Sequence, residues 1–133
     1  MRTSLLRCLS LCLLAGCSST SPYPAYAIED DAEQISNVVV SDLSLQDVVR
    51  VGKAQMLRTS SGQLRVIVPV RNIDSEPIQV LAQISFQDAQ RQPIGDTTNR
   101  QVAIIPAGGT VDMEWTSRNQ QAADYVLRLG WNN

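Results

Sequence analysis

The segment Leu64–Asn72, LRVIVPVRN, decides the fold because its side chains alternate between two environments. Every even-numbered position from 64 to 70 is leucine or valine, and arginine, isoleucine and proline stand between them. Because successive side chains of a strand point to opposite faces, this pattern predicts a β-strand with one buried face and one wetter face. Pro69 has no N–H to donate to a neighbouring strand, so it indicates a sheet edge or a bulge.

The same two-residue period recurs in three later segments, at residues 80–87, 111–116 and 125–131. Turn-forming residues separate the strands, with Ser60-Ser61-Gly62 before the segment that starts at Leu64 and Pro106-Ala107-Gly108-Gly109 before the segment at residues 111–116. Short strands at this spacing, joined by turns of this kind, are typical of an antiparallel sandwich.

Helical patterns are short and confined to residues 45–51 and 119–124. We therefore predict a mainly β fold over residues 35–133, namely an immunoglobulin-like antiparallel β-sandwich of about seven strands. A domain of this length can bury a core that is stable without disulfides.

The segment before this domain, residues 17–34, has the composition of a flexible linker. It contains small polar residues and two prolines, followed by four acids between Glu29 and Glu33. Few of its side chains can contribute to a core, so we expect a linker behind a lipidated N-terminus. The acidic run lacks the alternating ligands and the glycine of a calcium loop, so a solvated run is expected and no metal site.

The N-terminus has the pattern of an export signal. Arg2 and Arg7 supply positive charge, and the apolar run from Leu5 to Ala15 is too short to cross a bilayer as a helix. A charged start, a short apolar run and small residues at the cut are typical of a secretory signal peptide, which we assign to residues 1–16.

The tetrapeptide Leu14-Ala15-Gly16-Cys17 resembles the bacterial lipobox, in which the cysteine is acylated and the bond before it is cut. The alternative is an ordinary signal peptide with a chance cysteine. With Ser18 after the cysteine in place of aspartate, the resemblance implies a Gram-negative outer membrane, with the domain facing the periplasm. Acyl chains on Cys17 would then hold the protein on the membrane.

Composition excludes several classes of function. The chain contains no histidine, and Cys8 and Cys12 fall in the segment that would be removed. Disulfides, thiolate catalysis and cysteine or histidine metal sites are therefore excluded, and no cofactor is expected. Lys53 is the only lysine and the arginines are scattered, so a basic stripe for nucleic acid is missing.

Four segments, taken in order, resemble the YcfL-like family of small bacterial outer-membrane lipoproteins. They are LRVIVPVRN (64–72), EPIQVLAQISFQDAQRQPI (76–94), IPAGG (105–109) and AADYVLRL (122–129). Gln90 and Arg91 stand where the family pattern has glycine. The resemblance implies a periplasm-facing sandwich on an outer-membrane anchor, and it transfers no activity.

We interpret the domain as a non-catalytic binding or assembly module that contacts an envelope protein. The segment Gln87–Asn99 is long, polar and free of strand pattern, as recognition loops tend to be, and the edge near Pro69 is a second candidate. The residues proposed to contact a partner are Gln87, Asp88, Arg91 and Asp96. The alternative is a variable connection that has no partner.

Two other functions are considered. Asp112 and Glu114, two apart on one strand face, could form an acid/base pair of the glycosidase kind, but a solvated face balanced by arginines is favoured. Tyr125, Trp115 and Trp131 could contact a glycan or peptidoglycan, although their period favours the core. No catalytic residue is therefore proposed, and the chain is not expected to be an enzyme.

Overall fold

The computed structural model describes residues 23–97 and 100–133. In this part of the chain it contains one short helix, α1 (Leu43–Val48), and ten strands. The strands are β1 (Tyr23–Ala27), β2 (Gln34–Val40), β3 (Val49–Val51), β4 (Gln55–Arg58), β5 (Leu64–Asn72), β6 (Ile78–Gln87), β7 (Pro93–Thr97), β8 (Gln101–Ile105), β9 (Thr110–Thr116) and β10 (Asp124–Trp131). The predicted mainly β class is confirmed.

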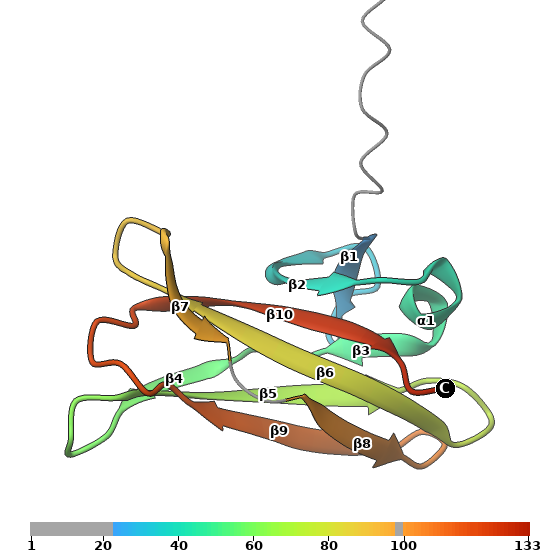
Figure 1. Ribbon diagram of the computed structural model, residues 1–133. Coiled ribbons are helices and arrows are strands. Elements are labelled where there is room, and N and C mark those ends of the chain that lie inside the picture. The colour runs from blue at the N-terminus through green and yellow to red at the C-terminus, as the bar shows by residue number, and fades with distance from the viewer. Residues whose placement is uncertain (1–22, 98–99) are drawn as a thin grey trace, which may run out of the picture.

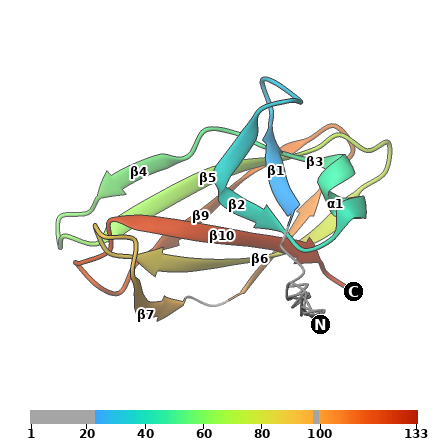
Figure 2. The ribbon, with the colours of Figure 1, turned by 90° about the horizontal axis from the view of Figure 1, so that it is seen from above.

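The strands form one strongly curled sheet whose two halves face each other like the layers of a sandwich (Figure 1). Its hydrogen-bonded order is β4-β5-β3-β1-β2-β10-β6-β7, with β9 added to β5 and β8 added to β6. Strands β6 and β10 lie across β5 and β9, as the two views agree (Figures 1 and 2). Buried side chains of both layers form a single core, which confirms the sandwich class.

Strand β5 shows why the sequence alternates. Its buried positions are the even-numbered ones from Leu64 to Asn72, and Val68 is fully buried, as the pattern predicts. Burying a valine or leucine side chain stabilises a fold by about 1.5–3 kcal/mol. Strand β6 alternates in the same way, and it pairs with β10 over eight residues, from Val80 opposite Trp131 to Gln87 opposite Asp124.

The sheet is mixed, whereas the sequence pattern predicts a purely antiparallel one with about seven strands. Strand β1 runs parallel to β3, and β10 runs parallel to β2. Both parallel pairs involve the N-terminal strands β1 and β2, which the period-two pattern does not reveal. The sequence YPAYA of β1 lacks the β-branched residues typical of strands, so its place between β2 and β3 decides its conformation.

The prediction of a flexible linker over residues 17–34 is wrong from residue 23 onward. Ala25 and Ala27 of β1 are buried, and small side chains suit this position inside the curled sheet. The acidic run forms the turn from β1 to β2, closed by the N–H of Ala27 donating to the carbonyl of Glu33 at 2.8 Å. Its Asp31 carboxylate pairs with Arg50 at 3.1 Å. The folded part therefore includes residues 23–34.

Pro69 lies opposite the break between β3 and β4 and not at a sheet edge, so the predicted edge is wrong. Along β5, β3 pairs up to Val51 opposite Val70 and β4 resumes at Gln55 opposite Ile67. Between these two pairings, the N–H of Gly52 donates to the carbonyl of Pro69 at 2.8 Å. On the other side of β5, Pro69 stands opposite Asp112 of β9, so β5 is an inner strand.

The predicted helices are confirmed only in part. Helix α1 overlaps the candidate segment 45–51, but residues 49–51 form β3. Residues 119–121 form a turn, in which the side chain of Asn119 accepts the N–H of Gln121 at 2.7 Å.

Among the described residues, the structure contains no helix with the length and apolar character needed to span a membrane.

Candidate functional site

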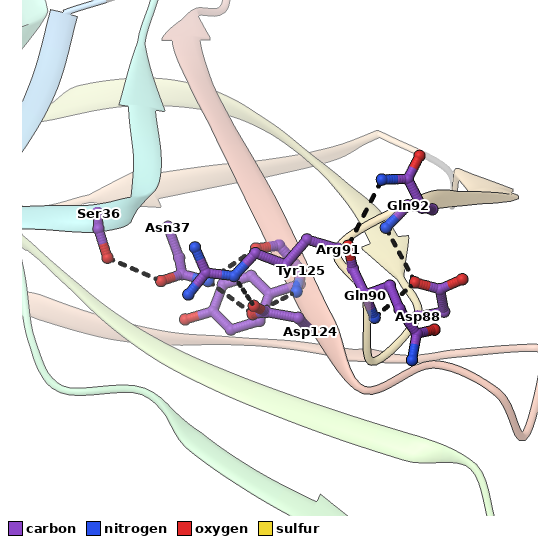
Figure 3. Close-up of polar contacts among 8 residues, drawn as sticks. All are labelled: Ser36, Asn37, Asp88, Gln90, Arg91, Gln92, Asp124 and Tyr125. Atoms are coloured by element: carbon purple, nitrogen blue, oxygen red, sulfur yellow. Dashed lines mark hydrogen bonds and ion pairs between the residues drawn. The ribbon is translucent and has the colours of Figure 1, made fainter.

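The connection between β6 and β7 is a tight turn over residues 88–92, which we call the Arg91 turn. Asp88 closes it, because its N–H donates to the carbonyl of Gln92 at 2.9 Å. Its Oδ1 accepts the N–H groups of Gln90 and Gln92, both at 2.9 Å (Figure 3). After this turn β7 pairs back onto β6. The prediction of an irregular loop over Gln87–Asn99 is therefore wrong, since an aspartate-capped turn and a strand occupy most of it.

Arg91 has a left-handed backbone, with a φ of 61°. This conformation costs a residue with a Cβ atom about 1–2 kcal/mol, and glycine avoids the cost. Glycine would suit this left-handed position, but the chain has arginine there. The Arg91 side chain is 82% exposed. The turn therefore holds a strained residue whose charged group projects into solvent.

Three side chains from distant parts of the sequence form a polar cluster beside this turn (Figure 3). The side-chain amide of Asn37, on β2, donates to Asp124 Oδ1 at 2.7 Å and to the carbonyl of Tyr125 at 2.9 Å. Arg91 Nε lies 3.7 Å from Asp124 Oδ2. Asn37 thus fixes one oxygen of the Asp124 carboxylate, and the other faces the exposed guanidinium.

Tyr125 supports this cluster from the core side. Its side chain is buried, and burial, together with the negative charge of Asp124, raises its pKa to about 12. The phenol is therefore neutral at physiological pH. Next to it lies a small pocket of about 240 Å³, which we call the Arg91 pocket. It is lined by Ser36, Asn37, Gln87, Arg91, Asp124, Tyr125 and Val126.

The structure brings together three of the four residues proposed to contact a partner. Gln87 ends β6 and lines the Arg91 pocket, Asp88 caps the turn, and Arg91 extends from it. Asn37 and Asp124 belong to the same site but were missed. They come from strands far apart in sequence, and only the sheet order β2-β10-β6 places them beside the turn.

Asp96 does not belong to this site, so its prediction as an exposed contact residue is wrong. It lies on β7 and is only 7% exposed. Its Oδ2 accepts the backbone N–H groups of Arg118 at 2.6 Å and Asn119 at 3.3 Å. The sequence of β7, PIGDT, contains proline, glycine and aspartate, which are rare in strands, so nothing in it indicated an inward-facing residue.

Asp112 and Glu114 lie on the exposed face of β9. Glu114 accepts a hydrogen bond from Arg65 Nε, and this bond lowers the pKa of the Glu114 carboxyl below its usual range. A general acid of the glycosidase kind needs the opposite shift, so that it carries a proton at neutral pH. The geometry therefore agrees with a solvated face balanced by an arginine.

The aromatic residues do not form a shared platform. Trp115 and Tyr125 are buried in the core, as their period predicts. Trp131 is half-buried, and its Nε1 donates to Ser44 Oγ at 2.9 Å. A stacked pair of exposed tryptophans for a glycan is therefore not formed by these residues.

The lipidation site Cys17 and the lipobox residues Leu14, Ala15 and Gly16 lie outside the described residues. Within residues 23–97 and 100–133, no group of three His, Cys, Asp or Glu side chains is placed to hold a metal ion. The chemistry of the described site is therefore that of hydrogen bonds and charge pairs around Arg91.

Comparison with solved structures finds the same fold in small bacterial proteins. The protein cj0090 of Campylobacter jejuni is similar over 74% of this chain and 100% of its own, with a TM-score of 0.61 and 20% identity. A DUF1425 family member from Shewanella sp. pv-4 is similar over 61% of this chain and 75% of its own, with a TM-score of 0.56 and 13% identity. At these identities the likeness concerns the fold alone. No family model matches the sequence, and no curated protein is similar to it.

Proposed function

We propose that this chain is a lipoprotein of the bacterial cell envelope, held in the outer membrane by acyl chains on Cys17 and facing the periplasm. Its β-sandwich acts there as a non-catalytic binding or assembly module, and the Arg91 turn is its contact surface. Membership of the YcfL-like family is part of this proposal, and the likeness to small bacterial proteins is consistent with it.

The backbone of Arg91 carries the proposal. The turn is closed by Asp88 and by main-chain bonds, so the Arg91 side chain contributes nothing to its closure. Glycine at position 91 would keep the same bonds and relieve the strain. Strained backbone at an exposed charged residue points to a function for the side chain, because the fold gives no reason for arginine there.

The chemistry of the turn favours an acidic segment of an envelope protein as the partner. The guanidinium lies near one carboxylate oxygen of Asp124, at 3.7 Å, and an exposed pair of this kind contributes little to stability. A partner carboxylate can accept two parallel N–H bonds from the same group, which is a stronger and more directional contact. The polar side chains of the Arg91 pocket supply further donors and acceptors around it.

Site-specific photo-crosslinking in cells tests this proposal. A crosslinking residue at Gln90, inside the turn, should capture one envelope protein. The matched control is a crosslinker at Asp74, which lies in the connection between β5 and β6 at the other end of β6. The capture from Gln90 should be lost in the Arg91→Ala variant and should survive in an Asp112→Asn variant.

Two results would contradict the proposal. One is a crosslinking pattern at Gln90 that does not exceed that at Asp74. The other is capture that persists unchanged in Arg91→Ala, because the guanidinium would then have no part in the contact.

A further inference from the structure

The outward face of the layer formed by β2, β10, β6 and β8 carries apolar side chains that do not enter the core. Val102 and Ile104 of β8 are 52% and 64% exposed, and they alternate with buried Ala103 and Ile105. Leu81 of β6 stands opposite Val102 and is half-buried. Strands β2, β10 and β6 lie side by side in this layer (Figure 2). We call Leu81, Val102 and Ile104 the β8 patch.

A hollow of about 200 Å³ adjoins the β8 patch, and Leu81 lines both. Gly130 stands opposite Leu81 and keeps the hollow open, because a Cβ atom at Gly130 would lie 2.9 Å from Ser41 Oγ. Glycine inside a strand often marks the close approach of another group. The hollow is smaller than sites for drug-sized ligands, which measure about 300–1,000 Å³. It therefore suits one compact chemical group at the surface.

Two arginines give this hollow a positive charge. Arg100 directly precedes β8, Arg128 stands opposite Gln83, and all three residues line the hollow. Both arginines are exposed, and neither forms an ion pair within residues 23–97 and 100–133. Strands β6 and β8 contain no acidic residue, and Asp124 on β10 is four residues from Arg128, roughly 13 Å along the strand. The hollow is therefore locally basic in a chain of net negative charge.

The chain enters the fold beside this hollow. Tyr23 begins β1 and pairs with Val40, and the next residue, Ser41, lines the hollow. Tyr23 comes six residues after Cys17, and six residues span at most about 20–22 Å. This step rests on the proposed function, because acyl chains on Cys17 would then keep the hollow and the β8 patch within reach of the bilayer.

We propose that the β8 patch and its basic hollow dock the tethered domain on an anionic phospholipid surface. The guanidinium groups of Arg100 and Arg128 donate to headgroup phosphates, and the apolar side chains enter the boundary between headgroups and acyl chains. The tether raises the effective concentration of the surface, so that a weak contact is populated. The Arg91 turn follows Gln87, six residues from Leu81 and roughly 20 Å along β6, so docking leaves it available to a protein partner.

Fluorescence of the lipidated protein in vesicles tests the docking. The protein, purified with its acyl chains, is reconstituted into vesicles of phosphatidylcholine alone or of phosphatidylcholine mixed equally with phosphatidylglycerol. A polarity-sensitive fluorophore is attached at Gln79→Cys, because Gln79 stands opposite Ile104 on the same face. Its emission should shift to the blue in the anionic vesicles and not in the neutral ones. The same fluorophore at Asp112→Cys, on the exposed face of β9, should stay in water in both.

Charge variants test the role of the two arginines. Each arginine near an anionic surface strengthens binding about fivefold, so Arg100→Gln combined with Arg128→Gln should lower the ratio of docked to undocked protein about 25-fold. The matched control, Arg71→Gln combined with Arg118→Gln, removes the same charge from other surfaces and should dock as the unchanged protein does. All four side chains are exposed, so both variants should fold. Val102→Ser should also weaken docking, although it changes no charge.

Flotation of the vesicles distinguishes failure of the docking from failure of the anchor. Protein that floats with both kinds of vesicle, while the fluorophore at Gln79→Cys stays in water, overturns the docking alone. Protein that floats with neither overturns both proposals, because nothing then holds the domain at the bilayer.

Other results overturn the docking even when the anchor holds. One is an equal blue shift in neutral and anionic vesicles, and another is an unchanged shift in the variant that lacks Arg100 and Arg128. A shift that appears only when soluble polyglutamate is added would assign this face to an acidic protein partner and not to the membrane.

Discussion

Replacing Arg91 with glycine should stabilise the protein relative to replacing it with alanine. Both variants remove the guanidinium and its 3.7 Å contact with Asp124, so that loss cancels in the comparison. Glycine alone relieves the left-handed backbone, at φ 61°, which is worth about 1–2 kcal/mol. Its greater freedom in the unfolded chain offsets about 0.4–1 kcal/mol of this gain. The net expectation is that Arg91→Gly is about 1 kcal/mol more stable than Arg91→Ala.

Urea unfolding measures this difference. The fluorescence of Trp115 reports on the transition, because this residue is buried in the folded state. In thermal unfolding, 1 kcal/mol corresponds to a Tm difference of about 4 °C for a domain of this size. Arg91→Ala should lie within about 0.5 kcal/mol of the unchanged protein, since an exposed ion pair contributes little.

Equal stability of the glycine and alanine variants would refute the reasoning. It would mean that the backbone at position 91 is not held in the left-handed region, and the strain that supports a role for the arginine would be gone. A large loss of stability in Arg91→Ala would also contradict it, because the side chain would then be part of the fold.

Three further predictions concern the core and the titrating groups. Val68→Asp should unfold the domain, because an unpaired buried charge costs several kcal/mol and the total free energy of unfolding is only about 5–15 kcal/mol. Circular dichroism melting measures this, and Val102→Asp, at an exposed position, should have little effect. Tyr125 has a pKa of about 12 in the folded protein against 10 when unfolded, so it should contribute stability below pH 10 that is lost as the pH rises toward 12. In an absorbance titration of the phenolates, Tyr125→Phe should remove the ionisation step near pH 12, and a titration unchanged by this variant would contradict the prediction. Glu114 should titrate below the usual carboxyl range, so its contribution is lost as the pH falls through that lowered pKa, and Arg65→Gln should move the titration upward in a carbon-13 spectrum.

The sandwich class could be predicted because a strand that buries one face alternates apolar and polar residues along the sequence. Strand β5 alternates in this way, and the structure buries the face that carries Val68, as the sequence predicts. Strand β1 could not be predicted, because its alanines suit a strand only where β2 and β3 flank it. The parallel pairing of β10 with β2 could not be predicted either, because the register between strands far apart in sequence depends on the assembled core.

The candidate site was predictable only where one stretch of sequence carries it. Gln87, Asp88 and Arg91 are close in the chain, and their polar composition indicated an exposed loop, although not the tight turn that the structure contains. Asp96 is equally polar, yet the alternation of β7 turns it inward, where the N–H groups of Arg118 and Asn119 meet it. A polar residue in a sequence without strand pattern gives no sign of the face that it will occupy.

The proposal that this fold works as a module tethered to a membrane by Cys17 is tested most directly by the mass of the mature protein. Intact mass spectrometry of the protein purified from a Gram-negative host should give residues 17–133 plus the acyl chains carried by the cysteine. Cys17→Ser should remain an unprocessed precursor that includes residues 1–16. A mature protein with an unmodified cysteine, or one that starts beyond position 17, would contradict the account.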